Sequence, residues 1–318
     1  MRLPGHKLPS FEIGLVLLLG LLWGSPYALT KISLETIPPI TLVAGRVALA
    51  AAVLWLVVIV RRHPVPQTWH FSGRLFIQGV LSCALPYTLI AFGQQTVESA
   101  LTAILNSTVP LFVCFISVFW THHESMTPRR IFGVAIGFSG VIGIVGASAL
   151  FGLGQQVLGQ AAITLATFSS ALSVIHARRF DSVAPEVVAA GMLTSATMLL
   201  VPLCLLLEAP WQVSPSIPSL VALLVNAVIA TALGFVVYFR LVRTIGSMGT
   251  ASSSYLKPAV GVVIGFVFLG EPLTWVLVGG LVAILAGVVA INTGRPVPVV
   301  GSDWQRNRAF GDASNPAA

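Results

Sequence analysis

The sequence predicts an all-α integral membrane protein with ten transmembrane helices, arranged as two five-helix repeats of inverted topology. Of its 318 residues, 56% are hydrophobic and only 8% are charged, whereas a soluble domain carries about 25% charged residues. Apolar stretches of about 20 residues, the length that crosses a bilayer as a helix, recur along the whole chain. The two halves of the chain also resemble each other. This composition excludes a soluble enzyme.

Ten apolar segments with short connections qualify as spans. They cover approximately residues 11–31, 38–60, 75–94, 99–120, 128–149, 155–177, 185–207, 217–239, 248–270 and 273–293. The longest connection is the polar stretch from Arg61 to Arg74. The first segment follows two basic residues as a signal peptide does, but no small-residue cleavage site comes after it, so we count it as a span.

The basic residues predict the orientation. Summed over alternate connections, fourteen lysines and arginines fall on one side and Lys31 alone falls on the other. Because basic loops stay in the cytoplasm, we expect a multi-pass membrane protein with both termini cytoplasmic. Residues 1–10 then form a cytoplasmic N-terminus, and the polar residues 294–318 form a disordered cytoplasmic tail.

An offset of 147 residues aligns the chain with itself. The aligned pairs are Lys31 with Arg178, Pro38 with Pro185, Glu124 with Glu271, Thr127 with Thr274, Gly133 with Gly280 and Gly140 with Gly287. The repeats therefore comprise residues 11–149 and 155–293, with five spans each. An odd number of spans inverts the second copy in the membrane, and such inverted repeats are typical of secondary carriers.

Several segments resemble the drug/metabolite transporter superfamily, specifically its EamA-type ten-helix permeases. They are WGSPYALTKISLETIPPITLVAGR from Trp23, SALTAILNSTVPLF from Ser99 with ESMTPRRIFGVAIGFSG from Glu124, and ASSSYLKPAVGVVIGFVFLGEPLT from Ala251. The resemblance extends from Gly14 to Asn292 and implies a carrier of small metabolites in the inner (plasma) membrane, often an amino-acid or metabolite exporter, with a central cavity between the halves. The turn WTHHESMT departs from the family pattern, which has a small apolar residue and a glycine before the glutamate.

Two cations fall inside predicted spans, where an ionisable side chain costs roughly 2.5 to 3.5 kcal/mol. Lys257 lies near the middle of the ninth span, and Pro258 cannot donate to the carbonyl of Ser254, so the helix is broken beside the charge. We expect Lys257 to bind substrate; the alternative is a structural lysine bonded to free carbonyls. The planar guanidinium of Arg46 presents a fork of N–H donors that suits a carboxylate, so we also expect Arg46 to bind substrate. The alternative is that Arg46 bonds to carbonyls at helix ends and holds the two halves together.

Polar and aromatic residues complete the predicted binding site. In the fourth span Pro110 frees the carbonyl of Asn106, which makes a second helix break that matches Pro258 and Ser254. We expect substrate contacts from Lys257, Arg46, Asn106, Ser254, Tyr27, Tyr87, Tyr238 and Tyr255, with hinges at Pro110 and Pro258. Single serines and asparagines also serve as hydrogen-bond links between helices, and aromatic residues at span ends form interfacial belts.

Glu124 with Thr127, and Glu271 with Thr274, mark a tight turn into the last helix of each half, where the threonine caps the helix. Glycines in these helices at four-residue spacing predict close packing. The packing is compatible with contacts inside one chain and with contacts in a homodimer.

No cofactor, metal site or nucleic-acid partner is predicted. The chain lacks the GxxxxGK[ST] motif of ATP-driven pumps. Its six histidines fall in or beside loops, and its carboxylates fall near helix ends. Transport coupled to a proton, through Lys257, and exchange for another solute are therefore both compatible with the sequence.

The sequence favours a secondary transporter in the lipid bilayer that moves a small molecule by alternating access. Because both deep charges are positive, we expect an anionic or zwitterionic substrate, such as an amino acid. One alternative is an intramembrane enzyme on lipid-like substrates, which requires a cluster of His, Asp or Glu that the sequence does not offer. Another is a non-transporting scaffold, which predicts partner-binding domains or long charged tails.

Overall fold

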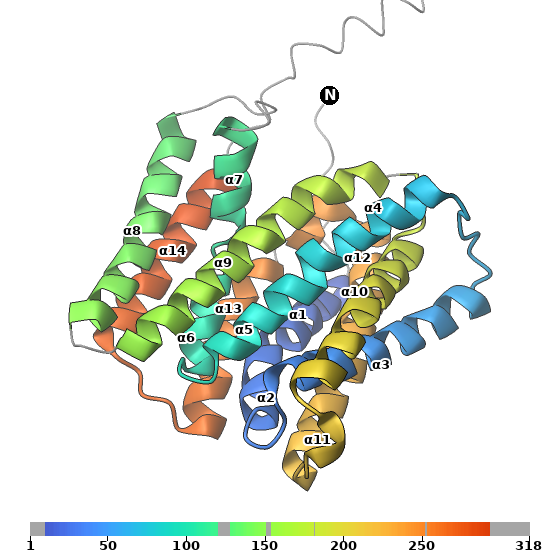
Figure 1. The fold of residues 1–318 in the computed structure, drawn as a ribbon. Helices are drawn as coiled ribbons and strands as arrows, with labels where there is room; N and C mark the ends of the chain where they lie inside the picture. The colour runs from blue at the N-terminus through green and yellow to red at the C-terminus, as the bar shows by residue number, and fades with distance from the viewer. Residues whose placement is uncertain (1–9, 120–127, 151–153, 181, 252, 293–318) are drawn as a thin grey trace, which may run out of the picture.

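The computed structural model describes residues 10–119, 128–150, 154–180, 182–251 and 253–292, and within them the chain is all-helical (Figure 1). Glu124, Thr127 and the predicted cytoplasmic ends lie outside the described residues. In the first half the helices are α1 (Ser10–Gly24), α2 (Pro26–Ser33), α3 (Pro39–Val60), α4 (Trp69–Gly79), η1 (Val80–Ala84), α5 (Leu85–Gly93), α6 (Ser99–Asn106), α7 (Val109–Phe119) and α8 (Pro128–Leu150). In the second half they are α9 (Gly154–Ala177), η2 (Arg178–Phe180), α10 (Pro185–Leu207), η3 (Pro210–Gln212), α11 (Ile217–Leu224), η4 (Val225–Leu233), α12 (Gly234–Ala251), α13 (Ser253–Leu269) and α14 (Trp275–Asn292).

Seven of the described helical segments are long and apolar enough to cross a membrane. They are Phe11–Ser33, Pro39–Val60, Trp69–Gly93, Ser99–Ser117, Gln156–Phe180, Pro185–Leu207 and Ile217–Gly246. Three further apolar helices are shorter and cover Ile131–Ile144, Ser253–Leu269 and Trp275–Ala290. Each of the ten predicted segments thus corresponds to an apolar helix, and seven of these have spanning length.

Two helical segments extend beyond the boundaries expected from the sequence. The third begins at Trp69 rather than at residue 75, because the Thr68 hydroxyl accepts from the Phe71 N–H at 3.3 Å and caps the helix. The expected loop from Arg61 to Arg74 is shortened accordingly. The eighth continues past residue 239 to a kink at Gly246, whose φ is +76°. Arginines 240 and 243 therefore lie on a helix and not in a loop.

Prolines break or bend the helices where the chain crosses the interior. Pro110 has no N–H for the carbonyl of Asn106, so α6 ends there and α7 begins at Val109. The hydroxyls of Ser107 and Thr108 donate to the carbonyls of Ile104 and Leu105 and satisfy the broken turn. Pro258 lies inside α13 and likewise frees the carbonyl of Ser254.

The third helical segment of each half contains a π-helix, η1 and η4, and at the offset of 147 residues η1 falls within η4. A π-helix adds a residue to a turn, and such turns occur frequently at functional sites.

A few pairs of helices make most of the packing contacts in the bundle. Buried leucines, valines and alanines join α3 to α10, and α8 packs along α14 with α7 beside them (Figure 1). A Cβ at Gly287 would overlap the backbone of Gly133 and Gly137, so this close approach requires glycine.

The ends of the helices form two opposite faces. One face, which we call the arginine face, carries Arg61, Arg178, Arg179, Arg240 and Arg243. The other, which we call the capped face, carries Lys31, Glu98, Glu208 and Glu271, and α2 and α11 meet there (Figure 1).

Candidate substrate cavity

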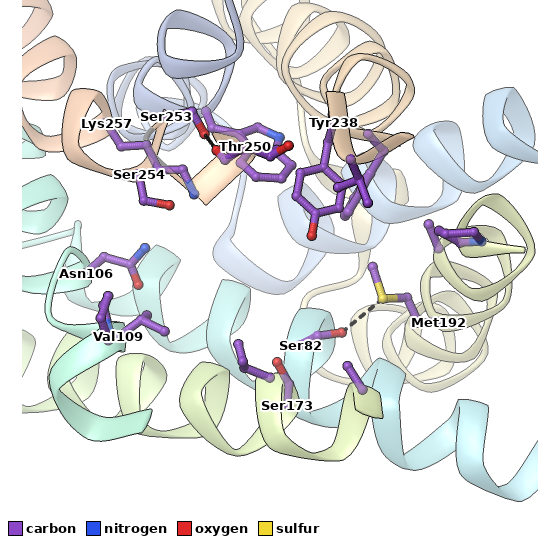
Figure 2. Close-up of a pocket in the computed structure, with 18 of the residues that line it drawn as sticks. Ser82, Asn106, Val109, Ser173, Met192, Tyr238, Thr250, Ser253, Ser254 and Lys257 are labelled. Atoms are coloured by element: carbon purple, nitrogen blue, oxygen red, sulfur yellow. Dashed lines mark hydrogen bonds between the residues drawn. The ribbon is translucent and has the colours of Figure 1, made fainter. Parts of the chain in front are cut away.

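A cavity of about 660 Å³ lies between the helices of the two halves. Its lining combines polar groups with an apolar wall, which is typical of small-molecule sites. The lining residues are Trp23, Tyr27, Gln78, Ser82, Tyr87, Ala103, Asn106, Ser107, Val109, Pro110, Ser173, Val174, Ala177, Phe180, Val183, Pro185, Val188, Ala189, Met192, Phe235, Tyr238, Phe239, Val242, Thr250, Ser253, Ser254, Tyr255, Lys257, Leu285 and Val288. Figure 2 draws 18 of these residues, which project from several helices toward one space.

The cavity extends toward the arginine face. Ala177, Phe180, Val183 and Pro185 line it, and they run from the end of α9 to the start of α10, beside Arg178 and Arg179. At the other end the lining stops at Tyr27, Tyr87 and Ala103. Of the described residues, none in the connections of the capped face lines the cavity. The cavity is thus closed on the capped side.

Lys257 is the charged group of the lining. It lies on α13, and Pro258 follows it inside the same helix. Its Nζ lies 4.3 Å from the centroid of the Trp23 ring, which makes a cation–π contact. Within the part of the chain that the structure describes, the ammonium has no carboxylate partner and no hydrogen-bond acceptor. A cation that faces a cavity in this way is available to an anionic group of a ligand.

Asn106 faces Lys257 across the cavity (Figure 2). Its Nδ2 donates to the Tyr27 hydroxyl at 2.6 Å, and its Oδ1 lies 3.5 Å from the Thr167 hydroxyl. Gln94 holds Tyr27 in turn, because its Nε2 donates to the Tyr27 carbonyl at 2.9 Å. The helix break at Asn106 therefore presents an amide whose orientation is fixed by neighbours on α2 and α9.

Aromatic rings form a wall beside Lys257. Trp23 and Tyr238 have ring centroids 5.2 Å apart, and Phe235 meets Trp23 edge-on at 5.8 Å. A Cβ at Gly234 would collide with the Trp23 indole, so the missing side chain there makes room for the ring. Tyr255, Ser253 and Ser254 complete this side of the lining.

Arg46 does not line the cavity. It lies on α3, 9% exposed, with its guanidinium carbon 4.2 Å from the centroid of the Tyr87 ring, and Tyr87 does line the cavity. Its Nε donates to the Thr231 hydroxyl at 3.0 Å. The structure thus brings together Lys257, Asn106, Ser254, Pro110 and the four tyrosines, and it places Arg46 behind one of these tyrosines.

Several lining residues were not expected from the sequence. The Ser82 hydroxyl lies 2.6 Å from the Gln78 carbonyl and 3.3 Å from the Met192 sulfur (Figure 2). The Oε1 of Gln78 lies 2.9 Å from Nδ1 of His176. Gln78, Ser82, Ser173, Met192 and Thr250 line the cavity and carry no charge. Met192 gives no sequence signal, and the signal of the other four is polarity within an apolar run, which hydrogen-bond links between helices share.

Of the predicted turn residues the structure describes Glu271 and Thr274, and they lie on the capped face, away from the cavity. The Glu271 carboxylate is 8% exposed and accepts from the N–H groups of Ser99 at 2.6 Å and Ala100 at 2.8 Å. It thereby binds the N-terminus of α6, where a negative charge is stabilised. Thr274 accepts from the Leu277 N–H at 3.2 Å at the start of α14.

Further contacts close the capped face. Lys31 donates to the carbonyls of Gln94 at 2.7 Å and Val97 at 3.0 Å. Glu208 accepts from the Ile40 N–H at 2.9 Å and the Thr41 N–H at 2.6 Å, at the start of α3. Burial, reinforced by the Glu271 carboxylate, raises the pKa of Glu98 above its ordinary value, while Lys31 acts in the opposite direction.

On the arginine face Glu186 gathers basic side chains at the start of α10. Its Oε1 pairs with Arg61 at 3.0 Å and with Arg243. The Arg61 and Arg243 side chains are 43% and 49% exposed. This cluster borders the open end of the cavity, because Pro185 and Val188 line it.

Apolar helices of spanning length around a partly polar cavity are typical of membrane transporters. The model of the EamA-like transporter family matches residues 10–146 and again residues 157–293. The chain belongs to the EamA-like transporter family, and seven of its described helical segments are long and apolar enough to cross a membrane, as expected of a multi-pass membrane transporter. The two matches indicate a duplicated chain.

Curated relatives carry transporter names. The chain is 27% identical to "Uncharacterized transporter YvbV" of Bacillus subtilis over 90% of this chain and 93% of that protein. It is 25% identical to "Uncharacterized inner membrane transporter YedA" of Escherichia coli K12, over 91% and 92%. It is 26% identical to a "Probable amino-acid metabolite efflux pump" of Salmonella typhimurium, over 86% and 92%. A solved structure titled "Crystal structure of protein" shares the fold, with a TM-score of 0.61, 20% identity and coverage of 89% of this chain and 97% of that one.

Proposed function

We propose that the protein is a secondary transporter that moves a small anionic or zwitterionic metabolite across the inner membrane. The observation that carries the proposal is Lys257, a cation that lines the cavity without a carboxylate partner in the described part of the chain. A carboxylate of the substrate would supply the missing counter-charge. The name of the Salmonella relative, an amino-acid metabolite efflux pump, is compatible with such a substrate.

The mechanism we propose is alternating access between two five-span repeats of opposite orientation. The double family match and the two π-helices at equivalent positions support a duplicated architecture. The cavity extends to one face and stops short of the other, as expected of one of the two access states. The distribution of basic residues supports cytoplasmic termini, so the cavity of this state faces the cytoplasm.

Ligand-dependent thermal stability tests the proposal. A ligand that binds the folded protein stabilises it by mass action, by about 2.7 kcal/mol at a concentration of 100 Kd. The unfolding midpoint of the purified protein is measured with amino acids, monocarboxylates, sugar phosphates, nucleosides and cationic drugs. We expect anionic or zwitterionic compounds to raise the midpoint of the wild type, and Lys257→Gln to remove that shift.

A matched control separates binding from structure. Lys31→Gln removes the same charge from a lysine that bonds to loop carbonyls outside the cavity. We expect this variant to unfold earlier and to keep the ligand shift. If compounds stabilise wild type and Lys257→Gln equally, Lys257 is not the substrate counter-ion. Should Lys257→Gln fail to fold, Lys257→Met removes the same charge with an apolar side chain of similar length, and the same comparison is made with it.

Uptake into proteoliposomes tests the transport step directly. The compound with the largest thermal shift is supplied in radiolabelled form outside vesicles loaded with unlabelled compound. We expect wild-type vesicles to accumulate label and vesicles with Lys257→Gln to accumulate it at least about tenfold more slowly, since a lost buried charge contact is worth more than 1.4 kcal/mol. A stabilising compound that does not cross the membrane would contradict the proposed transport.

A further inference from the structure

The second buried cation, Arg46, has far fewer partners than a guanidinium requires. Arginine carries five N–H donors and no acceptor. In the described part of the chain, its Nε donates to the Thr231 hydroxyl at 3.0 Å, and its terminal nitrogens have no acceptor. No carboxylate of the described residues pairs with it. With only 9% of its surface exposed, this cation is nearly desolvated and uncompensated, which is costly without an anionic partner.

A structural arginine would look different. Lys31 shows how this chain satisfies a structural cation, because its ammonium donates to two backbone carbonyls at 2.7 Å and 3.0 Å. Arg46 has one neutral hydroxyl and the face of the Tyr87 ring at 4.2 Å. The Thr231 hydroxyl is itself engaged, since it donates to the Asn226 carbonyl at 2.8 Å within the π-helix η4. These contacts hold the guanidinium in place without using its planar fork.

Arg46 lies at the depth where the cavity ends. It is seven residues from the start of α3, and Tyr87 is six residues from the end of α5. At 1.5 Å per residue both lie about 10 Å from the capped face. Lys257 is twelve residues from the end of α13, or about 18 Å from that face. Tyr87 therefore separates Arg46 from a cavity that holds the other cation about 8 Å further along.

We propose that Arg46 is a second anion-binding group of the transport site, covered by Tyr87 in this conformation, and that the solute carries two acidic groups. The proposal rests on the proposed function and narrows its substrate class. Lys257 takes one acidic group, and the unpaired fork of Arg46 takes the other once the Tyr87 ring moves aside. A solute with one carboxylate would neutralise only one of the two cations.

Carboxylates of defined length test whether the site holds two acidic groups. The concentration that gives half of the maximal thermal stabilisation is measured with butyrate, malonate, succinate and glutarate. We expect wild type to respond to at least one dicarboxylate at a concentration at least tenfold lower than to butyrate. We expect Arg46→Gln to lose this tenfold advantage and to keep its response to butyrate. Arg46→Lys retains the charge without the fork, and we expect it to recover part of the advantage.

The outcomes separate this inference from the proposed function. If wild type responds to butyrate and to the dicarboxylates at equal concentrations, the two-group site is overturned even if no Arg46 variant folds. If Arg46→Gln raises the concentrations of butyrate and of the dicarboxylates required for half-maximal stabilisation by the same factor, both cations bind one acidic group. The two-group site is then again overturned. If amino acids or other compounds of the first panel stabilise wild type and no dicarboxylate does, only the two-group site is overturned. If no anionic or zwitterionic compound of either panel stabilises wild type, the proposed function itself fails. Arg240→Gln, which removes a 54% exposed arginine from the other face, is the matched control and should leave all responses unchanged.

Discussion

The capped face and the arginine face are held together by different kinds of contact. On the capped face, Glu271 and Glu208 accept hydrogen bonds from backbone N–H groups at the starts of α6 and α3. On the arginine face, half-exposed arginines converge on Glu186. The cavity is closed beneath the first face and extends to the second.

The difference explains which face is closed in this conformation. A buried carboxylate at a helix N-terminus satisfies donors that otherwise have no partner, so its bonds are fixed and difficult to replace. On the arginine face the Glu186 carboxylate is buried too, but its arginine partners are half-exposed, so water can replace part of their contacts and salt screens them in part. Under the proposed alternating access, opening the capped face would break the buried hydrogen bonds of that face. A solute that binds both cations would help to offset that loss.

The largest expected effect comes from Glu271→Ala. The substitution removes two charge-assisted hydrogen bonds and leaves the N–H groups of Ser99 and Ala100 buried without an acceptor, which costs about 3 kcal/mol. The measurement is the free energy of unfolding in detergent. Glu35→Ala, an exposed glutamate on the same face, is the control and should change stability by less than about 0.5 kcal/mol. Equal losses for the two variants would contradict the account of the capped face.

An intermediate effect is expected from Glu208→Ala. This carboxylate binds the start of α3 through the Ile40 and Thr41 N–H groups and the Thr41 hydroxyl, but it is partly exposed. Water can satisfy part of what is lost, so we expect about 1.5 kcal/mol. Chemical denaturation gives the free energy of unfolding of this variant and of Glu271→Ala. The difference between the two losses measures how much burial of the carboxylate adds to its effect on stability. A larger loss for Glu208 than for Glu271 would reverse that ranking.

Arg243→Gln should have a small effect that depends on salt. Its side chain is 49% exposed, and Arg61 still pairs with the buried Glu186 carboxylate when Arg243 is removed, so we expect a loss of about 1 kcal/mol. We expect the loss to shrink in 1 M salt, where the Debye length is about 3 Å. Thermal unfolding at low and high salt tests this, with Glu271→Ala as the salt-insensitive reference. A loss of stability as large as that of Glu271→Ala would show that contacts on the two faces contribute equally to stability, and it would contradict the difference described above.

The smallest expected effect is a pH dependence from Glu98. Because its pKa is raised in the folded protein, the folded state retains a proton that the unfolded state has already released above the ordinary value of 4.5. Stability should therefore fall as pH rises from about 4.5 through the raised pKa, and Glu98→Gln should remove this slope. Unfolding midpoints of both proteins over that range test the sign. A midpoint that rises over that range in the wild type alone would contradict it.

The sequence allowed the helices to be predicted better than their ends. Hydropathy locates apolar segments because a bilayer requires them, but Trp69 to Arg74 and Arg240 to Arg243 extend helices with polar residues that lower the average. Long basic side chains reach the membrane surface from within a helix, so a charged residue does not mark a helix end. Nothing in the sequence indicated the π-helices, because a change in hydrogen-bond register does not alter the amino-acid composition or the hydropathy of a helix.

The site was predictable where a residue is costly in a membrane. Lys257 and the prolines stand out in apolar runs, and the Asn106 amide lies beside one of these prolines. Gln78, Ser82 and Ser173 were missed because small polar residues mostly link helices. Arg46 was noticed for its charge, but only the structure places it behind Tyr87, since this relation depends on the packing of α3 against α5.

The π-helices also set the rotational register of the helices that contain them. One added residue turns everything that follows by about 100° around the helix axis. In η1 this rotation lies between Gln78 and Tyr87, and both of these residues line the cavity. Deletion of a single residue from Val80–Ala84 would restore an ordinary α-helix. It would also turn the Tyr87 side chain away from both the cavity and Arg46. A one-residue deletion there should therefore impair the site more than many substitutions, because it would rotate one wall of the cavity as a unit.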